Sequence, residues 1–170
     1  MFVDVHCHLD HVRYKEDLDK VISRCKENNV TAVTCGVNKG SNRDVLEISK
    51  KYPDVVKAAF GMYPFDVIGL QRDESYSGKI PGSFDVDEEL EFIKKSKDKI
   101  VAISEIGLDK SIEDHQIEKQ KEIFSKIIAL SEKIRKPLIV HSRKAELECI
   151  ELLESCKHKK IIMHFFSGNF

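Results

Sequence analysis

The chain has 170 residues, a length typical of one domain. Hydrophobic residues make up 41% of it and charged residues 34%, which provides enough apolar material for a core and excludes a globally disordered chain. The formal net charge of −1 argues against a strongly basic nucleic-acid-binding protein and leaves room only for a local basic patch.

Short runs rich in Val and Ile recur along the chain and are predicted to be strands. Runs of this length and composition are typical of strands buried on both faces of a parallel sheet. The predicted strands are Phe2–His8, Thr31–Val37, Val55–Phe60, Ile100–Glu105, Leu138–His141 and Ile161–Phe165.

Charged amphipathic segments separate these runs and are predicted to be helices. Leu18, Ile22 and Cys25 lie on one apolar stripe at helical spacing. Strand–helix alternation of this kind predicts an α/β fold with parallel strands and right-handed crossovers, in a single domain over residues 1–170. The other predicted helices lie around Val45 and Ile48, around Leu90 and Ile93, from Asp114 to Arg135 and from Ala145 to Cys156, and Ile68–Phe84 is predicted to be a long surface loop.

Ionisable residues mark the ends of four predicted strands: His6 and His8 on the first, then Glu105, His141 and His164. The carboxyl ends of parallel strands in an α/β barrel are where ligand sites are built. Taken singly, a histidine here is more often structural, and Glu105 can simply form an ion pair at a strand end. Together, four imidazoles and a carboxylate predict a site for divalent metal ions, with Zn²⁺, Mg²⁺, Mn²⁺, Ni²⁺ and Co²⁺ left open.

Other polar residues near these strand ends are weaker candidates. Arg143 follows His141 and is predicted to bind a phosphate, while Lys144 is equally well a solvated residue. Asp10 and Asp109 are candidates for orienting ligands or binding substrate. Cys7 lies between two predicted ligands and is interpreted as a small core residue. His11, His115 and His158 lie in polar contexts away from the strand ends and are predicted to be surface residues.

The cysteines and the N-terminus predict a reducing compartment. The five cysteines are an odd number and none is spaced as C-x-x-C. The first residues lack the pattern of a signal peptide, and no apolar stretch reaches the length of about 20 residues that a membrane span needs. We therefore expect a cytoplasmic protein without membrane contact.

Five motifs in order resemble the TatD family of metal-dependent deoxyribonucleases. The motifs are Val5–Asp10 (VHCHLD), Gly61–Pro64 (GMYP), Ser104–Asp109 (SEIGLD), His141–Ala145 (HSRKA) and His164–Gly168 (HFFSG), and Gln120 also matches a position where the family favours glutamine.

The resemblance implies a TIM barrel of the amidohydrolase superfamily that uses two divalent metal ions to hydrolyse phosphodiester bonds. It implies that His6 and His8 hold one ion, that His141 and His164 hold the other, and that Glu105 bridges them. Glu105 and His141 would then be catalytic, with Tyr63, Arg143 and Asp109 near the substrate. Two ions in such a pair activate water near neutral pH and stabilise charge on phosphoryl oxygens.

The sequence departs from the family in two places. Tyr63 stands where the family usually has a histidine that is thought to contact substrate, so the phenol is expected to alter affinity or substrate choice. Only about six of the eight barrel units are recognisable, and the family's last strand supplies an Asp to the first metal. We expect the chain to be a fragment, a truncated product, or one part of an assembly in which self-association or a partner chain completes the barrel.

Three functions follow from these patterns. The first is a metal-dependent deoxyribonuclease acting on DNA. The second is a related phosphoesterase or amidohydrolase with a small substrate. The third is a truncated barrel without catalytic activity that binds metal or a partner chain.

Overall fold

The computed structural model describes residues 1–70, 85–113 and 115–168 of the chain. Its strands form one six-stranded parallel sheet in which each strand pairs with the next one along the sequence. This arrangement confirms the predicted parallel α/β fold. The strands are β1 (Phe2–Cys7), β2 (Val30–Cys35), β3 (Val56–Gly61), β4 (Ala102–Gly107), β5 (Leu138–His141) and β6 (Ile161–Met163).

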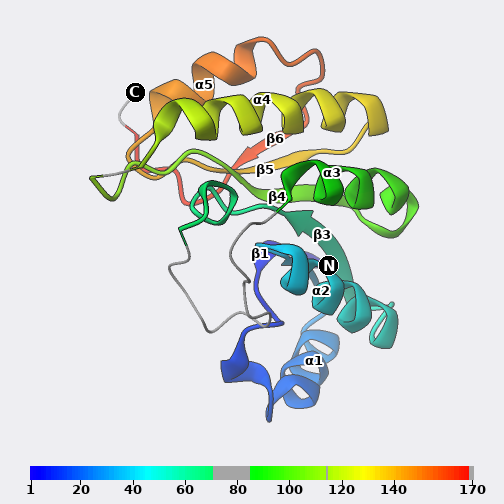
Figure 1. The fold of residues 1–170 in the computed structure, drawn as a ribbon. Helices are drawn as coiled ribbons and strands as arrows, with labels where there is room; N and C mark the ends of the chain where they lie inside the picture. The colour runs from blue at the N-terminus through cyan, green and yellow to red at the C-terminus, as the bar shows by residue number, and fades with distance from the viewer. Residues whose placement is uncertain (71–84, 114, 169–170) are drawn as a thin grey trace.

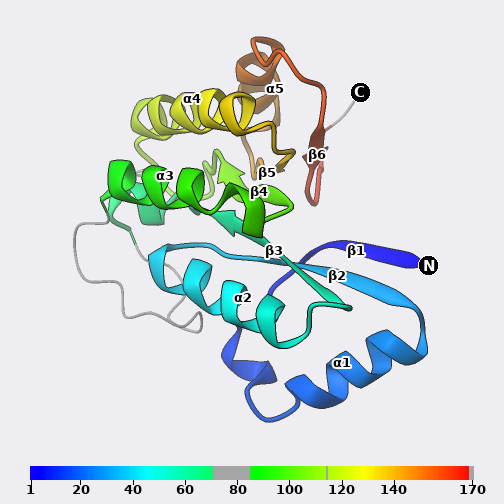
Figure 2. The same cartoon turned by 90° about the vertical axis from the view of Figure 1, so that its right-hand side faces the viewer.

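The sheet curls into part of a barrel, with the helices arranged along its outer side (Figures 1 and 2). Consecutive parallel strands require crossover connections, and the helices provide them. The helices are α1 (Leu18–Glu27), α2 (Lys39–Lys51), α3 (Val86–Lys95), α4 (Ile117–Ile134) and α5 (Glu146–Glu154), with 3₁₀ turns η1 (Val12–Tyr14), η2 (Asp66–Ile68) and η3 (Lys97–Lys99).

Helix boundaries follow local capping chemistry. The Asn38 side chain accepts a hydrogen bond from the Ser41 backbone N–H at the start of α2, and Asp85 accepts one from Glu88 at the start of α3. Arg135 ends α4 in the left-handed conformation, with φ of 58°. The predicted start of this helix, Asp114, lies outside the described residues, as does most of the predicted loop over Ile68–Phe84.

The principal core lies between the central strands and helices α3, α4 and α5. Phe60, Ile103 and Ile106 of β3 and β4 pack with Phe124 and Ile127 of α4, and all five are fully buried. Burial of side chains this large is the main source of stability in a domain of this size. A rigid central sheet therefore supports the strand ends. No helix in the described part of the chain is long and apolar enough to cross a membrane.

The first strand differs from its prediction. β1 was expected to be buried on both faces, but Phe2 is 73% and Val3 51% exposed. The reason is that β1 lies at the edge of the described sheet, where it pairs with β2 alone, and that its C-terminal end is the part that reaches the packed region.

Backbones approach closely at the C-terminal ends of the strands. A Cβ atom on Gly61 would overlap the carbonyl oxygens of Ser104 and Gly36, and both obstacles are backbone atoms that cannot move aside. Gly69, in contrast, has φ of 85°, and no atom of the described residues lies within 4 Å of the position that a Cβ atom would take.

We therefore expect Gly61→Ala to reduce the free energy of unfolding by at least about 3 kcal/mol, because the strands must separate to admit the methyl group. Gly69→Ala is the matched control and should cost only about 1 kcal/mol, from its left-handed backbone. Urea unfolding of both variants measures the difference. Equal losses would contradict the close approach at Gly61.

Candidate functional site

The C-terminal end of β1 delivers two imidazoles to one point. The pairing of β1 with β2 shifts register between Asp4 and Cys7, immediately before this end. The Nε2 atoms of His6 and His8 then lie 3.2 Å apart. His8 Nδ1 lies 2.8 Å from the Cys35 carbonyl oxygen, which can only accept, so the proton is on Nδ1 and the lone pair on Nε2 faces His6.

Glu105 reaches the same point from β4 through a strained backbone. Its φ is 45°, in the left-handed region, and the pairing of β4 with β5 shifts register between Ile103 and Ile106. A residue with a Cβ atom is disfavoured in this conformation by about 1–2 kcal/mol. Strain of this kind at the end of a buried strand indicates a side chain held for function.

The Glu105 carboxylate is the centre of the site. Its Oε1 atom lies 3.2 Å from His6 Nε2, 3.7 Å from His8 Nε2 and 3.9 Å from His164 Nε2. Its Oε2 atom lies 3.6 Å from His141 Nδ1. Four imidazoles from three strand ends therefore surround one carboxylate, and all five side chains that sequence analysis singled out as ligands lie together.

The three donors His6 Nε2, His8 Nε2 and Glu105 Oε1 form a triangle with sides of 3.2, 3.2 and 3.7 Å. Ligands about 2.1 Å from a tetrahedral metal ion lie about 3.4 Å from one another, so this spacing fits a divalent ion. Glu105 Oε2, on the His141 side of the carboxylate, is buried in the described structure without a hydrogen-bond partner. A buried carboxylate oxygen without a partner is costly, which favours a cation beside this oxygen as well.

The imidazoles and the carboxylate change one another's protonation. Burial favours neutral Glu105, but the neighbouring rings of His141, His6 and His8 outweigh burial and hold its pKa well below the usual value. His164 stacks on His6 with ring centroids 3.6 Å apart. Burial and the neighbouring His6 lower the pKa of His164 to about 4, so its ring is neutral and able to act as a ligand.

A second network lies beside the cluster. The Asp109 Oδ2 atom accepts hydrogen bonds from Tyr63 OH and His141 Nε2, each at 2.9 Å. Burial lowers the pKa of His141, but Asp109 and Glu105 outweigh it and raise that pKa to about 9. Burial raises the pKa of Asp109, but the hydrogen bonds that Asp109 accepts from His141 and Ser111 outweigh burial and lower this pKa to about 2. Asp109 therefore directs His141 Nδ1 towards Glu105.

The weaker candidates have different surroundings. Arg143 and Lys144 are exposed beyond the end of β5. Asp10 accepts a hydrogen bond from Ser41 Oγ, and its other oxygen is buried without a partner in the described structure. The Cys7 thiol donates to the Val33 carbonyl oxygen, and burial raises its pKa. His11, His115 and His158 are partly exposed, away from the cluster around Glu105.

Sequence reasoning missed the backbone contributions to the site. The Cys35 carbonyl oxygen sets the His8 tautomer, and the Thr34 hydroxyl accepts the Leu9 backbone N–H just beyond it. Both residues lie at the end of β2, inside a run that reads only as a buried strand. No signal in the sequence marks either contact.

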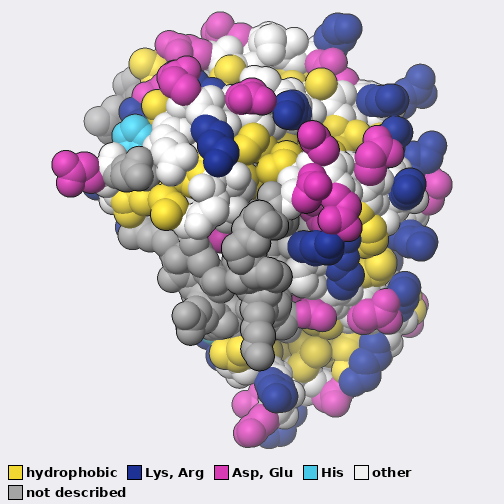
Figure 3. Space-filling model, viewed as in Figure 1, with side chains coloured by type: hydrophobic (Ala, Val, Ile, Leu, Met, Phe, Trp, Pro, Cys, Tyr) yellow, Lys and Arg dark blue, Asp and Glu magenta, His cyan; other side chains and the backbone are white. Residues whose placement is uncertain are grey.

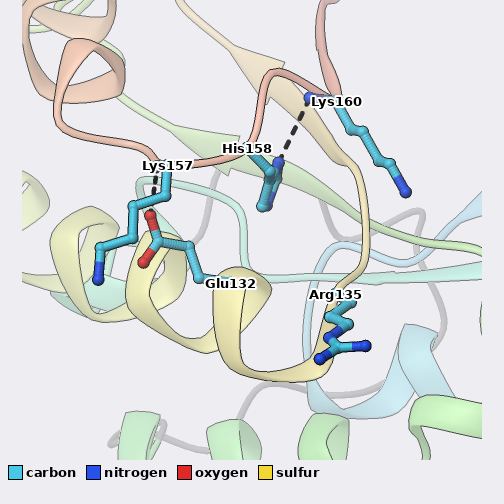
Figure 4. A pocket seen from close by; sticks show the side chains of 5 residues that line it. All are labelled: Glu132, Arg135, Lys157, His158 and Lys160. Atoms are coloured by element: carbon cyan, nitrogen blue, oxygen red, sulfur yellow. Dashed lines mark hydrogen bonds between the residues drawn. The ribbon is translucent and has the colours of Figure 1, made fainter.

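A separate cavity of about 340 Å³ lies between the end of α4 and the segment before β6 (Figure 4). The His158 ring donates to Ser131 Oγ at 3.0 Å and accepts from the Lys160 backbone N–H. The charged ends of Lys157 and Lys160 point away from each other in Figure 4. Cations that diverge in this way do not form an anion site, and His158 is a structural residue.

Comparison with known proteins identifies relatives along nearly the whole chain. A family model described as TatD related DNase matches residues 3–170. Human deoxyribonuclease TATDN3 is 33% identical over 98% of this chain and 61% of its own length. An uncharacterized metal-dependent hydrolase of Methanocaldococcus jannaschii is 32% identical over 99% of this chain and 60% of its own length. The chain thus spans about 60% of the length of these relatives.

Solved structures show the same fold. The crystal structure of YJJV, a TatD homologue from Escherichia coli, superposes with a TM-score of 0.81 at 24% identity, over 99% of this chain and 61% of that one. A TatD family hydrolase from Entamoeba histolytica gives a TM-score of 0.77 at 23% identity, over 98% and 58%. The six parallel strands therefore correspond to part of a TIM-barrel-like fold.

The raised pKa of His141 predicts a pH dependence of the metal-free protein. A histidine whose pKa is raised from 6.5 to about 9 on folding stabilises the folded state fully below pH 6.5, and that contribution is lost as the pH rises through 9. We expect the free energy of unfolding to fall by up to about 3 kcal/mol between pH 6.5 and 9. Urea unfolding across this range measures it, and Asp109→Asn should flatten the profile. An equally steep profile in Asp109→Asn would show that another group titrates.

Proposed function

Since the chain belongs to the TatD-related DNase family, we propose that the cluster around Glu105 is a divalent-metal centre at which the protein hydrolyses phosphodiester bonds of DNA. The observation that carries the proposal is the convergence of four imidazoles on one buried carboxylate. Relatives of this chain include a deoxyribonuclease and a metal-dependent hydrolase, which supports the same chemistry.

The geometry supports an assignment of ligands to two ions. His6, His8 and Glu105 Oε1 would hold the first ion, because their donor atoms form the triangle described above. His141 Nδ1 faces the other carboxylate oxygen, so it would hold the second ion together with His164, and Glu105 would bridge the two. Bound ions of this kind supply an activated water molecule and stabilise charge on the phosphoryl oxygens.

The protein's own groups prepare the site for a phosphate. Asp109 holds one His141 proton on Nε2, so Nδ1 is the nitrogen that would give up its proton and bind a metal ion. Tyr63 orients Asp109 from the other side and would contact the substrate together with it. Arg143, exposed beyond β5, would bind a phosphate oxygen.

The surface charge fits a substrate held mainly at the metal centre. Lys and Arg side chains are interspersed with Asp and Glu on the face shown in Figure 3, and the formal net charge is −1. A protein that binds nucleic acid through a broad basic surface shows a strong dependence on salt. The mixed charges on the face in Figure 3 do not form such a surface. We therefore infer that affinity for DNA comes from a few phosphates close to the cluster.

Metal binding tests the centre directly. Calorimetric titration of the metal-free protein with Co²⁺ or Zn²⁺ should show binding, and His6→Ala should weaken it by at least about 100-fold, because it removes a proposed ligand. His158→Ala is the matched control, since His158 lies in the separate cavity, and it should bind as the wild type does. Equal affinities for wild type and His6→Ala would refute the centre.

Nucleotide release from single-stranded DNA with Mg²⁺ or Mn²⁺ tests the reaction. We expect turnover that a chelator abolishes and that His6→Ala reduces by at least about 100-fold, while His158→Ala retains it. Metal binding without DNA cleavage, but with hydrolysis of small phosphate esters or cyclic amides, would favour the related hydrolase instead. Metal binding with no turnover on any of these would favour a barrel without catalytic activity.

A further inference from the structure

Two buried side-chain amides hold the backbone at the strand ends next to the site. Asn42 of α2 accepts the Gly61 N–H at 2.8 Å and donates to the Gly61 carbonyl oxygen at 2.9 Å. Gln120 of α4 accepts the Asp109 N–H at 2.8 Å and donates to the Asp109 carbonyl oxygen at 2.9 Å. Both side chains are fully buried. Each amide therefore satisfies both backbone groups of one residue, as a neighbouring strand would.

These amides act where the neighbouring strands have already ended. The last residue pair of β2 and β3 is Cys35 with Ala59, so Gly61 lies beyond the end of β2. The last residue pair of β3 and β4 is Gly61 with Ser104, so Asp109 lies beyond the end of β3. The residues on either side of Asp109, Leu108 and Lys110, donate their backbone N–H groups to the chain at and after the end of β5. Asn42 thus bridges a gap between β2 and β3, beyond which the Tyr63 N–H donates to the Val37 carbonyl oxygen at 2.7 Å, and Gln120 supplies the missing partner of Asp109.

The orientation of each amide is fixed by a further acceptor. Asn42 Nδ2 also donates to Glu89 Oε1 at 2.7 Å, and the buried Glu89 carboxylate is paired with Arg43. Gln120 Nε2 also donates to the His115 carbonyl oxygen. Because these acceptors cannot donate, rotating either amide by 180° would place oxygen against oxygen. The donor and the acceptor of each amide are therefore set.

The two anchored residues carry the network beside the metal centre. Tyr63 follows Gly61 by two residues, and its hydroxyl donates to the carboxylate of Asp109, which also accepts from His141. We propose that Asn42 and Gln120 are positioning residues that bring Tyr63 and Asp109 together and thereby orient His141. The proposal rests on the proposed function only in treating His141 as a metal ligand, because the positioning itself requires neither metal nor DNA.

Gln120→Met is the principal test, because it keeps a long helix-forming side chain and removes the hydrogen bonds. Ser131→Ala is the matched control: Ser131 is equally buried on the same helix and bonds to Ile128 and His158, away from the site. Two signals of the metal-free protein are read by NMR. They are the exchange rate of the Asp109 amide and the slowly exchanging Nε2–H signal of His141.

In Gln120→Met we expect Asp109 amide exchange to accelerate by at least 10-fold and the His141 Nε2–H signal to broaden or disappear, while Ser131→Ala changes neither. Metal affinity should fall by about 10-fold in Gln120→Met only. An unchanged His141 signal in a folded Gln120→Met protein would overturn the proposal.

A measurement on the wild type applies if Gln120→Met does not fold. The amides of Gly61 and Asp109 should then exchange as slowly as those inside β3 and β4, because the side chains protect them. Fast exchange at both would overturn the proposal. If the wild type binds no metal, the proposed function fails, but these amide and imidazole signals still decide whether the two side chains position the network.

Discussion

The attraction between one buried carboxylate and the imidazoles around it determines how the strand ends are arranged. Glu105 is nearly inaccessible to water, and a carboxylate in such a place is stable only when cations or hydrogen-bond donors surround it. His6, His8, His141 and His164 supply these partners from β1, β5 and the end of β6. Because the partners come from segments far apart in the sequence, the curl of the sheet and the chemistry of the site depend on each other.

Strained and irregular backbone at the strand ends positions the side chains around Glu105. Glu105 adopts a left-handed conformation, the β1 and β4 pairings both shift register just before their polar ends, and Gly61 is required where three backbones approach. Irregularities of this kind at strand ends redirect side chains that a regular pleat would send to opposite faces. The rigid core around Phe60 and Phe124 supplies the stability that offsets them.

Periodicity and position at strand ends were sufficient to predict the parallel α/β fold and the residues that cluster. Val- and Ile-rich runs locate strands because these residues favour buried strands. Ionisable residues at the ends of such runs stand out because a buried strand rarely contains them. The exposure of β1 could not be predicted this way, since a Val-rich run looks the same at an edge as at the centre. The links from Asn42 to Gly61 and from Gln120 to Asp109 join a side chain to a distant backbone, and no local pattern encodes them.

The position of His6 and His8 on the least protected strand has a thermodynamic consequence. Among the described residues β1 pairs with β2 alone, so opening of this edge is among the least costly local fluctuations of the part of the fold that the structure describes. One such opening would withdraw two imidazoles from Glu105 together while the central sheet stays intact. A cation bound by both these imidazoles and the carboxylate would oppose the opening, and more strongly the tighter it binds. Metal binding at the centre would therefore order β1, and opening of β1 would weaken metal binding.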